Sequence, residues 1–240
     1  MNNYRPSFLN SIPPITKNLI AINVILWLAT LVLPGLVNRW AINFDLTDIL
    51  GMHYWASSKF SPAQLITYMF MHGGFNHIFF NMFALYMFGG VLENLWGPKR
   101  YLFYYLITGI GAGLIQQLFW TVEYHSALSA INAAISSNVI NAPDLIAQKI
   151  LFLNMPITIG ASWSIFGLLL AFGWLFPEAK LMLIFFPVPI KARIFVLIYG
   201  VVELFMGVAQ FSGDSVAHFA HLGGMLFGAI LILWWKKKNY

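Results

Sequence analysis

Serine, histidine and asparagine side chains occur at spacings that could perform acyl transfer. His77 and Asn81 are four residues apart, so on a helix they share one face and can donate hydrogen bonds toward one point. Ser162 lies at the start of an apolar run that is expected to be a helix, and the N-terminus of a helix favours developing negative charge. His221 precedes a Gly-x-x-x-Gly step, which permits close helix packing. Together they supply a nucleophile (Ser162), a base (His221) and two oxyanion donors.

A partner acid for the histidine is not evident from the sequence. Asp214 is the nearest acid, seven residues before His221 in a short connection, and we do not expect it to reach the imidazole. Glu203 has no evident partner, and Glu93 is expected to make a structural bond to nearby loop groups. We therefore expect a Ser–His dyad, in which packing on an aromatic ring replaces the orienting role of an acid.

The composition indicates that lipid is part of the solvent for this chain. Sixty percent of its 240 residues are hydrophobic and 9% are charged, against roughly a quarter charged in soluble domains. The absence of cysteine excludes thiol catalysis and thiolate metal sites. The net charge of +5 is attributed to basic residues on the cytoplasmic face rather than to a nucleic-acid partner.

Six apolar stretches are long enough to span a bilayer, which takes about 20 residues. Ten of the 13 lysines and arginines fall on the side of the two termini, so both termini are predicted to be cytoplasmic. The prediction is an all-α integral membrane bundle, a single domain over residues 1–240, with spans at roughly 18–37, 75–95, 101–120, 157–176, 194–211 and 217–235.

Three connections are long enough to hold structure of their own. Residues 38–74 are rich in aromatic side chains and are expected to lie in the membrane interface. Residues 121–156 are expected to form a loop with a small helix, and residues 177–193 an interfacial hairpin or strand. His53 lies in residues 38–74 and His125 in residues 121–156, the two connections predicted on the outer side, and both are interpreted as ordinary surface residues.

The three polar motifs together resemble those of the rhomboid family of intramembrane serine proteases. Residues 72–81 match the family's HxxxxHxxxN pattern, Ser162 matches the nucleophile of its GxSG motif, and residues 220–228 match its AHxxGxxxG motif. Each motif alone is weak, whereas the three in this order are specific. The resemblance covers roughly residues 18–235 and implies the family's six-helix fold.

The resemblance also implies a role for each matched residue. Ser162 would attack the scissile carbonyl, and His221 would act first as base and then as acid. The oxyanion would be stabilised by the Ser162 N–H, His77 and Asn81, and Phe166 would stack on the catalytic histidine. We also expect three residues to line the cavity or to be structural: His72, His218 and Trp163.

Further expectations concern the substrate and the membrane. The family's substrates are single-span membrane proteins, cut near the outer end of a helix that must unwind to expose its peptide bond. Lipid is the other expected partner, with no nucleic acid, cofactor or metal. The predicted location is a cell membrane, crossed several times, of the bacterial inner or plasma membrane type.

Two alternatives to an active protease remain. The family has glycine after the nucleophile and this chain has Trp163, which favours a pseudoprotease that binds transmembrane helices. The other alternative is a metal or proton transporter lined by His72, His77, His218 and His221. The chain has no HExxH motif, and no carboxylate lies beside these histidines in sequence.

Overall fold

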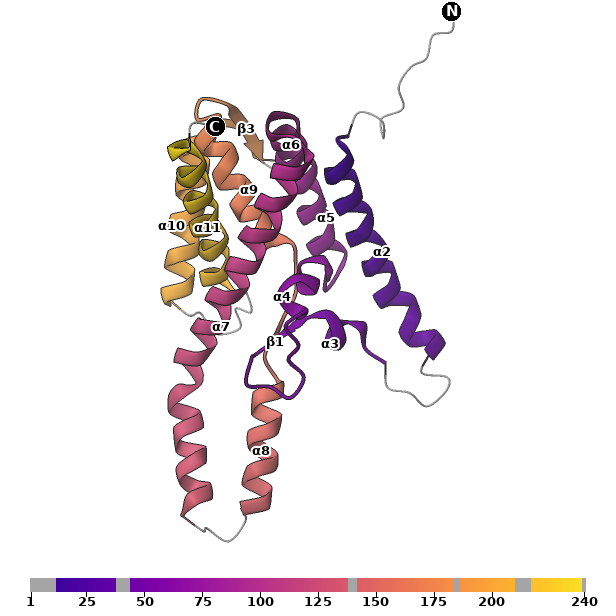
Figure 1. The fold of residues 1–240 in the computed structure, drawn as a ribbon, viewed down its shortest axis with the longest axis vertical. Coiled ribbons are helices and arrows are strands. Elements are labelled where there is room, and N and C mark those ends of the chain that lie inside the picture. Colours follow the sequence, from indigo (N-terminus) through magenta and orange to yellow (C-terminus); the bar gives the residue numbers. More distant parts are fainter. Residues whose placement is uncertain (1–11, 38–43, 138–141, 184–185, 210–216, 239–240) are drawn as a thin grey trace, which may run out of the picture.

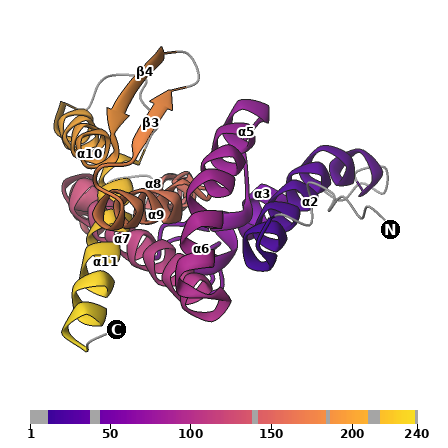
Figure 2. The ribbon, with the colours of Figure 1, turned by 90° about the horizontal axis from the view of Figure 1, so that it is seen from above.

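Helices dominate the computed structural model, which describes residues 12–37, 44–137, 142–183, 186–209 and 217–238 (Figures 1 and 2). The expected all-α membrane fold class is confirmed. Within these residues, five helical stretches are long and apolar enough to cross a membrane: α2 (Pro14–Val37), Phe75–Trp96, α7 (Pro98–Ser136), α10 (Ala192–Ala209) and α11 (His218–Lys237). The predicted span 157–176 contains a shorter apolar helix, α9 (Ser162–Leu175).

The stretch Phe75–Trp96 is built from three consecutive pieces. They are α5 (Phe75–Ala84), a π-helical turn η3 (Leu85–Gly89) and α6 (Gly90–Trp96). Near its end, the Glu93 carboxylate accepts the backbone N–H groups of Ile15 and Thr16 at 2.9 and 2.7 Å. A structural bond was expected for Glu93; its partner is the N-terminus of α2, where a carboxylate is favoured.

Helix α7 is much longer than the predicted span 101–120. Its 39 residues extend about 58 Å, roughly twice the thickness of a hydrocarbon core. The second half projects beyond the bundle beside α8 (Ala142–Asn154), as Figure 1 shows. The prediction of a loop with a small helix over residues 121–156 is confirmed for the small helix, which is α8, and wrong for residues 121–136, which continue α7. Residues 121–136 lack glycine and proline and are rich in alanine, so nothing there ends the helix.

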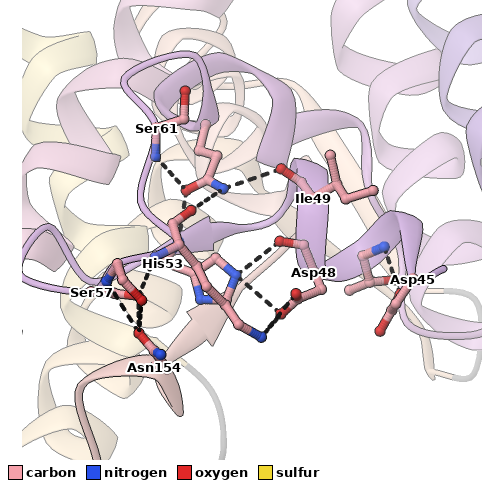
Figure 3. Close-up of polar contacts among 11 residues, drawn as sticks. Asp45, Asp48, Ile49, His53, Ser57, Ser61 and Asn154 are labelled. Carbon is pink, nitrogen blue, oxygen red and sulfur yellow. Dashed lines mark hydrogen bonds and ion pairs between the residues drawn. The ribbon is translucent and has the colours of Figure 1, made fainter. Parts of the chain in front are cut away.

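The connection between α2 and α5 forms a compact unit of short elements. These are α3 (Leu46–Leu50), β1 (Met52–His53), α4 (Gln64–Thr67) and a 3-10 turn, η2 (Tyr68–Phe70). The prediction that His53 is a surface residue is wrong, because it is 1% exposed. Its Nε2 lies 2.9 Å from the carbonyl oxygen of Asp48 (Figure 3). Gln64 and Gln117 bond to its backbone. Because Gln117 belongs to α7, its hydrogen bond connects this unit to that helix.

A β-hairpin follows α9, which confirms the hairpin predicted within 177–193. Strands β3 (Lys180–Leu183) and β4 (Phe186–Lys191) pair antiparallel. The exposed Glu178 forms ion pairs with Lys191 and Arg193 at its base. The hydrogen bond from Lys191 lowers the pKa of the Glu178 carboxyl, so this contact gains strength above the ordinary pKa of a glutamate.

Close packing around α9 depends on glycine. A Cβ on Gly224 would lie 2.0 Å from the carbonyl oxygen of Trp163, and one on Gly228 would meet the Tyr104 hydroxyl. That hydroxyl donates to the carbonyl of Gly167 at 2.9 Å. The Gly-x-x-x-Gly step of α11 therefore brings its backbone against α9, as the sequence predicted.

Candidate active site

Ser162 and His221 meet where α9 and α11 begin. Ser162 is the first residue of α9 and His221 lies in the first turn of α11. The Ser162 Oγ is 2.9 Å from the His221 Nε2, an ordinary hydrogen-bond distance. Gly224 is one turn further along α11, so the close contact of the two backbones brings the two side chains together.

The ring of Phe166 fixes the plane of this imidazole. Phe166 follows Ser162 by one turn of α9, and its ring stacks on His221 with centroids 4.2 Å apart and planes 11° apart. Tyr199 of α10 packs in turn against Phe166, at 6.0 Å between ring centroids. The plane of the imidazole is therefore set by a ring that is itself packed against α10.

Glu203 of α10 completes a chain of polar contacts that the sequence did not predict. Its Oε2 lies 2.9 Å from the Nδ1 of His221 and 2.7 Å from the Nδ1 of His218. The statement that Glu203 has no evident partner is therefore wrong. An ionised carboxylate only accepts hydrogen bonds, so each Nδ1 is a donor and the Nε2 of His221 can accept from Ser162. Asp214 lies outside the described residues.

A sequence signal for this contact does exist, in the glycines around Glu203. Gly200 and Gly207 share one helical face with it, at spacings of three and four. A Cβ on Gly207 would lie 3.2 Å from the Cβ of His218, closer than almost all real contacts. Gly207 therefore lets α11 approach α10 at the level of Glu203. A glutamate between two such glycines therefore faces a neighbouring helix.

The other side of Ser162 is bordered by Gly160 and His77. Gly160 has a φ of 133°, a conformation that residues with a side chain rarely adopt. A Cβ there would lie 2.7 Å from the His77 Nε2 and 3.7 Å from the Ser162 Oγ, so both groups border the same space. The N–H of Gly160 donates to the carbonyl of Tyr68 at 2.9 Å. The pairing of β1 with β2 (Ile157–Thr158) anchors the same segment.

The remaining predicted site residues make a local hydrogen bond or ring contacts. Asn81 donates to the carbonyl of His77 within its own helix, at 3.0 Å. His72 is buried, with its ring 4.9 Å from that of His77. Trp163 is 3% exposed, and its ring packs against Tyr68 at 4.6 Å.

Glu203, His218 and His221 also have the composition of a metal site. Their ligand atoms lie within 4.8 Å of one another. Glu203 therefore supplies a carboxylate of the kind whose absence beside the histidines in sequence had weakened the transporter alternative. The N···O distances of 2.7 and 2.9 Å are shorter than the about 3.3 Å expected between ligands of tetrahedral zinc, whose bonds are about 2.0–2.1 Å. The geometry therefore fits direct hydrogen bonds.

Comparisons with known proteins agree with the motifs. The family model described as "Rhomboid domain" matches residues 59–237. The chain is 30% identical over 178 residues to "Rhomboid protein 1, mitochondrial" of Saccharomyces cerevisiae, covering 74% of this chain and 43% of that protein. It is 29% identical over 189 residues to "Rhomboid-like protein 11, chloroplastic" of Arabidopsis thaliana, with 73% and 52% covered. The chain spans about half the length of these curated relatives.

Proposed function

Because the chain belongs to the rhomboid family, we propose that it is an intramembrane serine endopeptidase with Ser162 as nucleophile and His221 as base. The observation that carries the proposal is the 2.9 Å contact between Ser162 Oγ and His221 Nε2. Membership of the family supports an intramembrane protease or a related pseudoprotease. The hydrogen bond and the stacked ring of Phe166 favour the active form.

The first chemical step in this proposal is attack by Ser162 on a peptide carbonyl. The Ser162 proton moves to the His221 Nε2 as the Oγ–C bond forms, giving a tetrahedral oxyanion and an imidazolium. The imidazolium then gives the proton to the departing amine, which leaves an ester on Ser162. Water repeats the sequence in the second half, with His221 again taking and returning one proton.

The oxyanion would be stabilised by the start of α9 and by His77. The first N–H groups of a helix have no partner within it, and those of α9 begin at Ser162. They can donate to negative charge, which the helix dipole also favours. The His77 ring borders the space beside Ser162. Asn81 is also proposed as an oxyanion donor. In the structure its side-chain amide donates to the His77 carbonyl.

The length of α9 supports a transmembrane substrate. Its 14 residues rise about 21 Å, less than a hydrocarbon core of about 30 Å. A helix with its inner end at one face of the membrane would therefore hold Ser162 below the opposite face. A substrate helix must unwind there, since intact backbone hydrogen bonds shield its carbonyls.

The proposal places the protein in a cell membrane as a single multi-pass domain over residues 1–240, with both termini on the cytoplasmic side. The relatives' names refer to mitochondria and chloroplasts. Those names apply to those proteins, and the bacterial type of membrane stays a prediction for this chain. Proposed partners are lipid and transmembrane proteins, with no cofactor required.

A pseudoprotease that retains transmembrane helices is the second candidate. The observation that favours it is Trp163, which stands where the family motif has glycine. Its ring packs in the buried core against Tyr68, and its backbone carbonyl contacts Gly224 of α11.

Labelling with a serine-directed fluorophosphonate tests the proposal. The purified protein in detergent is compared with Ser162→Ala and Trp163→Gly, and cleavage of a reconstituted single-span substrate is followed in parallel. We expect labelling and cleavage in the unmodified protein and neither in Ser162→Ala. Labelling in Trp163→Gly alone would favour the pseudoprotease, and cleavage by Ser162→Ala would end the serine mechanism.

A further inference from the structure

We propose that Glu203 is a positioning residue that turns the Ser162–His221 pair into a Ser–His–Glu triad. This inference rests on the proposed serine protease function. It assigns a role in catalysis to a residue of α10 that lies outside all three sequence motifs.

Both nitrogens of the His221 ring have a bonded partner. The Nε2 lies 2.9 Å from the Ser162 Oγ, and the Nδ1 lies 2.9 Å from the Glu203 Oε2. The carboxylate can only accept, so the ring proton resides on Nδ1 and the lone pair on Nε2 faces the serine hydroxyl. This is the tautomer that a general base for Ser162 requires.

Stacking on Phe166 cannot supply the same selection. The ring of Phe166 contacts the face of the imidazole at an angle of 11°, so it sets the plane of His221. A ring carbon surface offers neither nitrogen a hydrogen-bond acceptor in the imidazole plane, so stacking leaves the choice of tautomer open. Glu203 places an acceptor oxygen 2.9 Å from Nδ1 and so determines which nitrogen holds the proton.

Burial makes the charge of Glu203 effective. The residue is 8% exposed within an apolar helix, where an ionised side chain needs partners. His218 supplies a second N–H to the same oxygen at 2.7 Å, and its backbone is held close by Gly207. When His221 takes the proton of Ser162, the resulting cation lies beside a fixed carboxylate in a region of low dielectric.

Two substitutions of similar cost to the fold separate charge from packing. Glu203→Gln keeps the size and removes the charge, whereas Glu203→Asp keeps the charge and shortens the side chain. We expect Glu203→Gln to lower kcat for a reconstituted single-span substrate by about 10²–10⁴-fold with KM changed less than about threefold, as removal of a triad acid's charge does in soluble enzymes. Glu203→Asp should retain at least about tenfold more activity than Glu203→Gln.

Glu93→Gln is the matched control. It makes the same change in another buried glutamate, whose partners are the backbone N–H groups of Ile15 and Thr16. We expect a lower Tm with kcat per folded molecule within about twofold of the unmodified protein. Thermal unfolding of both Glu203 variants shows whether each is folded at the assay temperature, and kcat is calculated per folded molecule.

The outcomes distinguish this inference from the function on which it rests. If Ser162→Ala is inactive while Glu203→Gln stays within threefold of the unmodified protein, the triad is refuted and the serine protease stands. A Glu203→Gln variant more active than Glu203→Asp would likewise refute it, because that order indicates packing. Full cleavage by Ser162→Ala would refute the proposed function itself.

Discussion

Replacing Gly224 by alanine is expected to separate the proposed nucleophile from its base. A Cβ at this position would lie 2.0 Å from the carbonyl oxygen of Trp163. The closest comfortable approach of carbon to a carbonyl oxygen is about 3.3 Å. That oxygen belongs to helix backbone and cannot rotate away, so α9 and α11 must separate locally by about 1.3 Å.

The separation acts directly on the contact between Ser162 and His221. Ser162 adjoins Trp163 in α9, and His221 lies one turn from Gly224 in α11. Their hydrogen bond of 2.9 Å would lengthen to about 4 Å, beyond the usual limit of about 3.2 Å. A misplacement of about 1 Å costs about 10²-fold in rate. Overpacking itself costs about 1–3 kcal/mol of stability.

The assay is the rate of fluorophosphonate labelling, measured together with Tm. Gly200→Ala is the control, because its new Cβ would lie 3.8 Å from the Met225 Sδ, an ordinary contact between α10 and α11. We expect Gly200→Ala to label within about twofold of the unmodified protein. A Gly224→Ala variant that labels as fast as Gly200→Ala would show that the close backbone contact does not position the site.

Three further predictions concern other parts of the site and the fold. Gly160→Ala should lower the free energy of unfolding by about 1–3 kcal/mol, seen as a lower Tm, because a φ of 133° is strained for alanine. It should also lower kcat, because the new methyl would clash with His77; unchanged substrate cleavage would contradict this. Phe166→Ala should lower kcat about 10–100-fold while Phe166→Tyr retains activity, because stacking on His221 needs a ring; equal kcat in the two variants would refute it. Glu93→Ala should cost about 2–3 kcal/mol by leaving the N-terminus of α2 without its carboxylate, measured by thermal unfolding, and an unchanged Tm would be the contrary result.

The apolar helices could be predicted because lipid imposes one strong rule on every span. A run of about 20 apolar residues satisfies its backbone only as a helix, so hydropathy alone located α2, α5 to α6, α10 and α11 within a few residues. The rule says nothing of helices that continue into water. For this reason the predicted start of α7, residue 101, falls within three residues of Pro98, whereas the predicted end is much too early, since helix propensity carries the helix to Ser136.

Polar contacts between helices were predictable only where one segment contains the whole pattern. The spacing of His77 and Asn81 and the glycines after His221 are local signals. The partners of Glu203 lie 15 and 18 residues away on another helix, and the register between two helices is set by packing. His53 was misjudged for the same reason: the side chains that bond to its backbone, Gln64 and Gln117, lie 11 and 64 residues further along the chain.

Two glycine contacts on α11 account for the position of the His221 ring. Gly224 allows α9 to approach and brings the serine to Nε2, whereas Gly207 of α10 allows the approach that brings Glu203 to Nδ1. The two contacts involve one short segment of α11, and each brings a partner to one nitrogen of His221. Because three helices approach together, the polar side chains of the site are hydrogen-bonded to one another inside an apolar bundle. The same close packing explains why Glu203 can be ionised there: its charge is shared by two imidazole N–H groups whose backbones cannot move away.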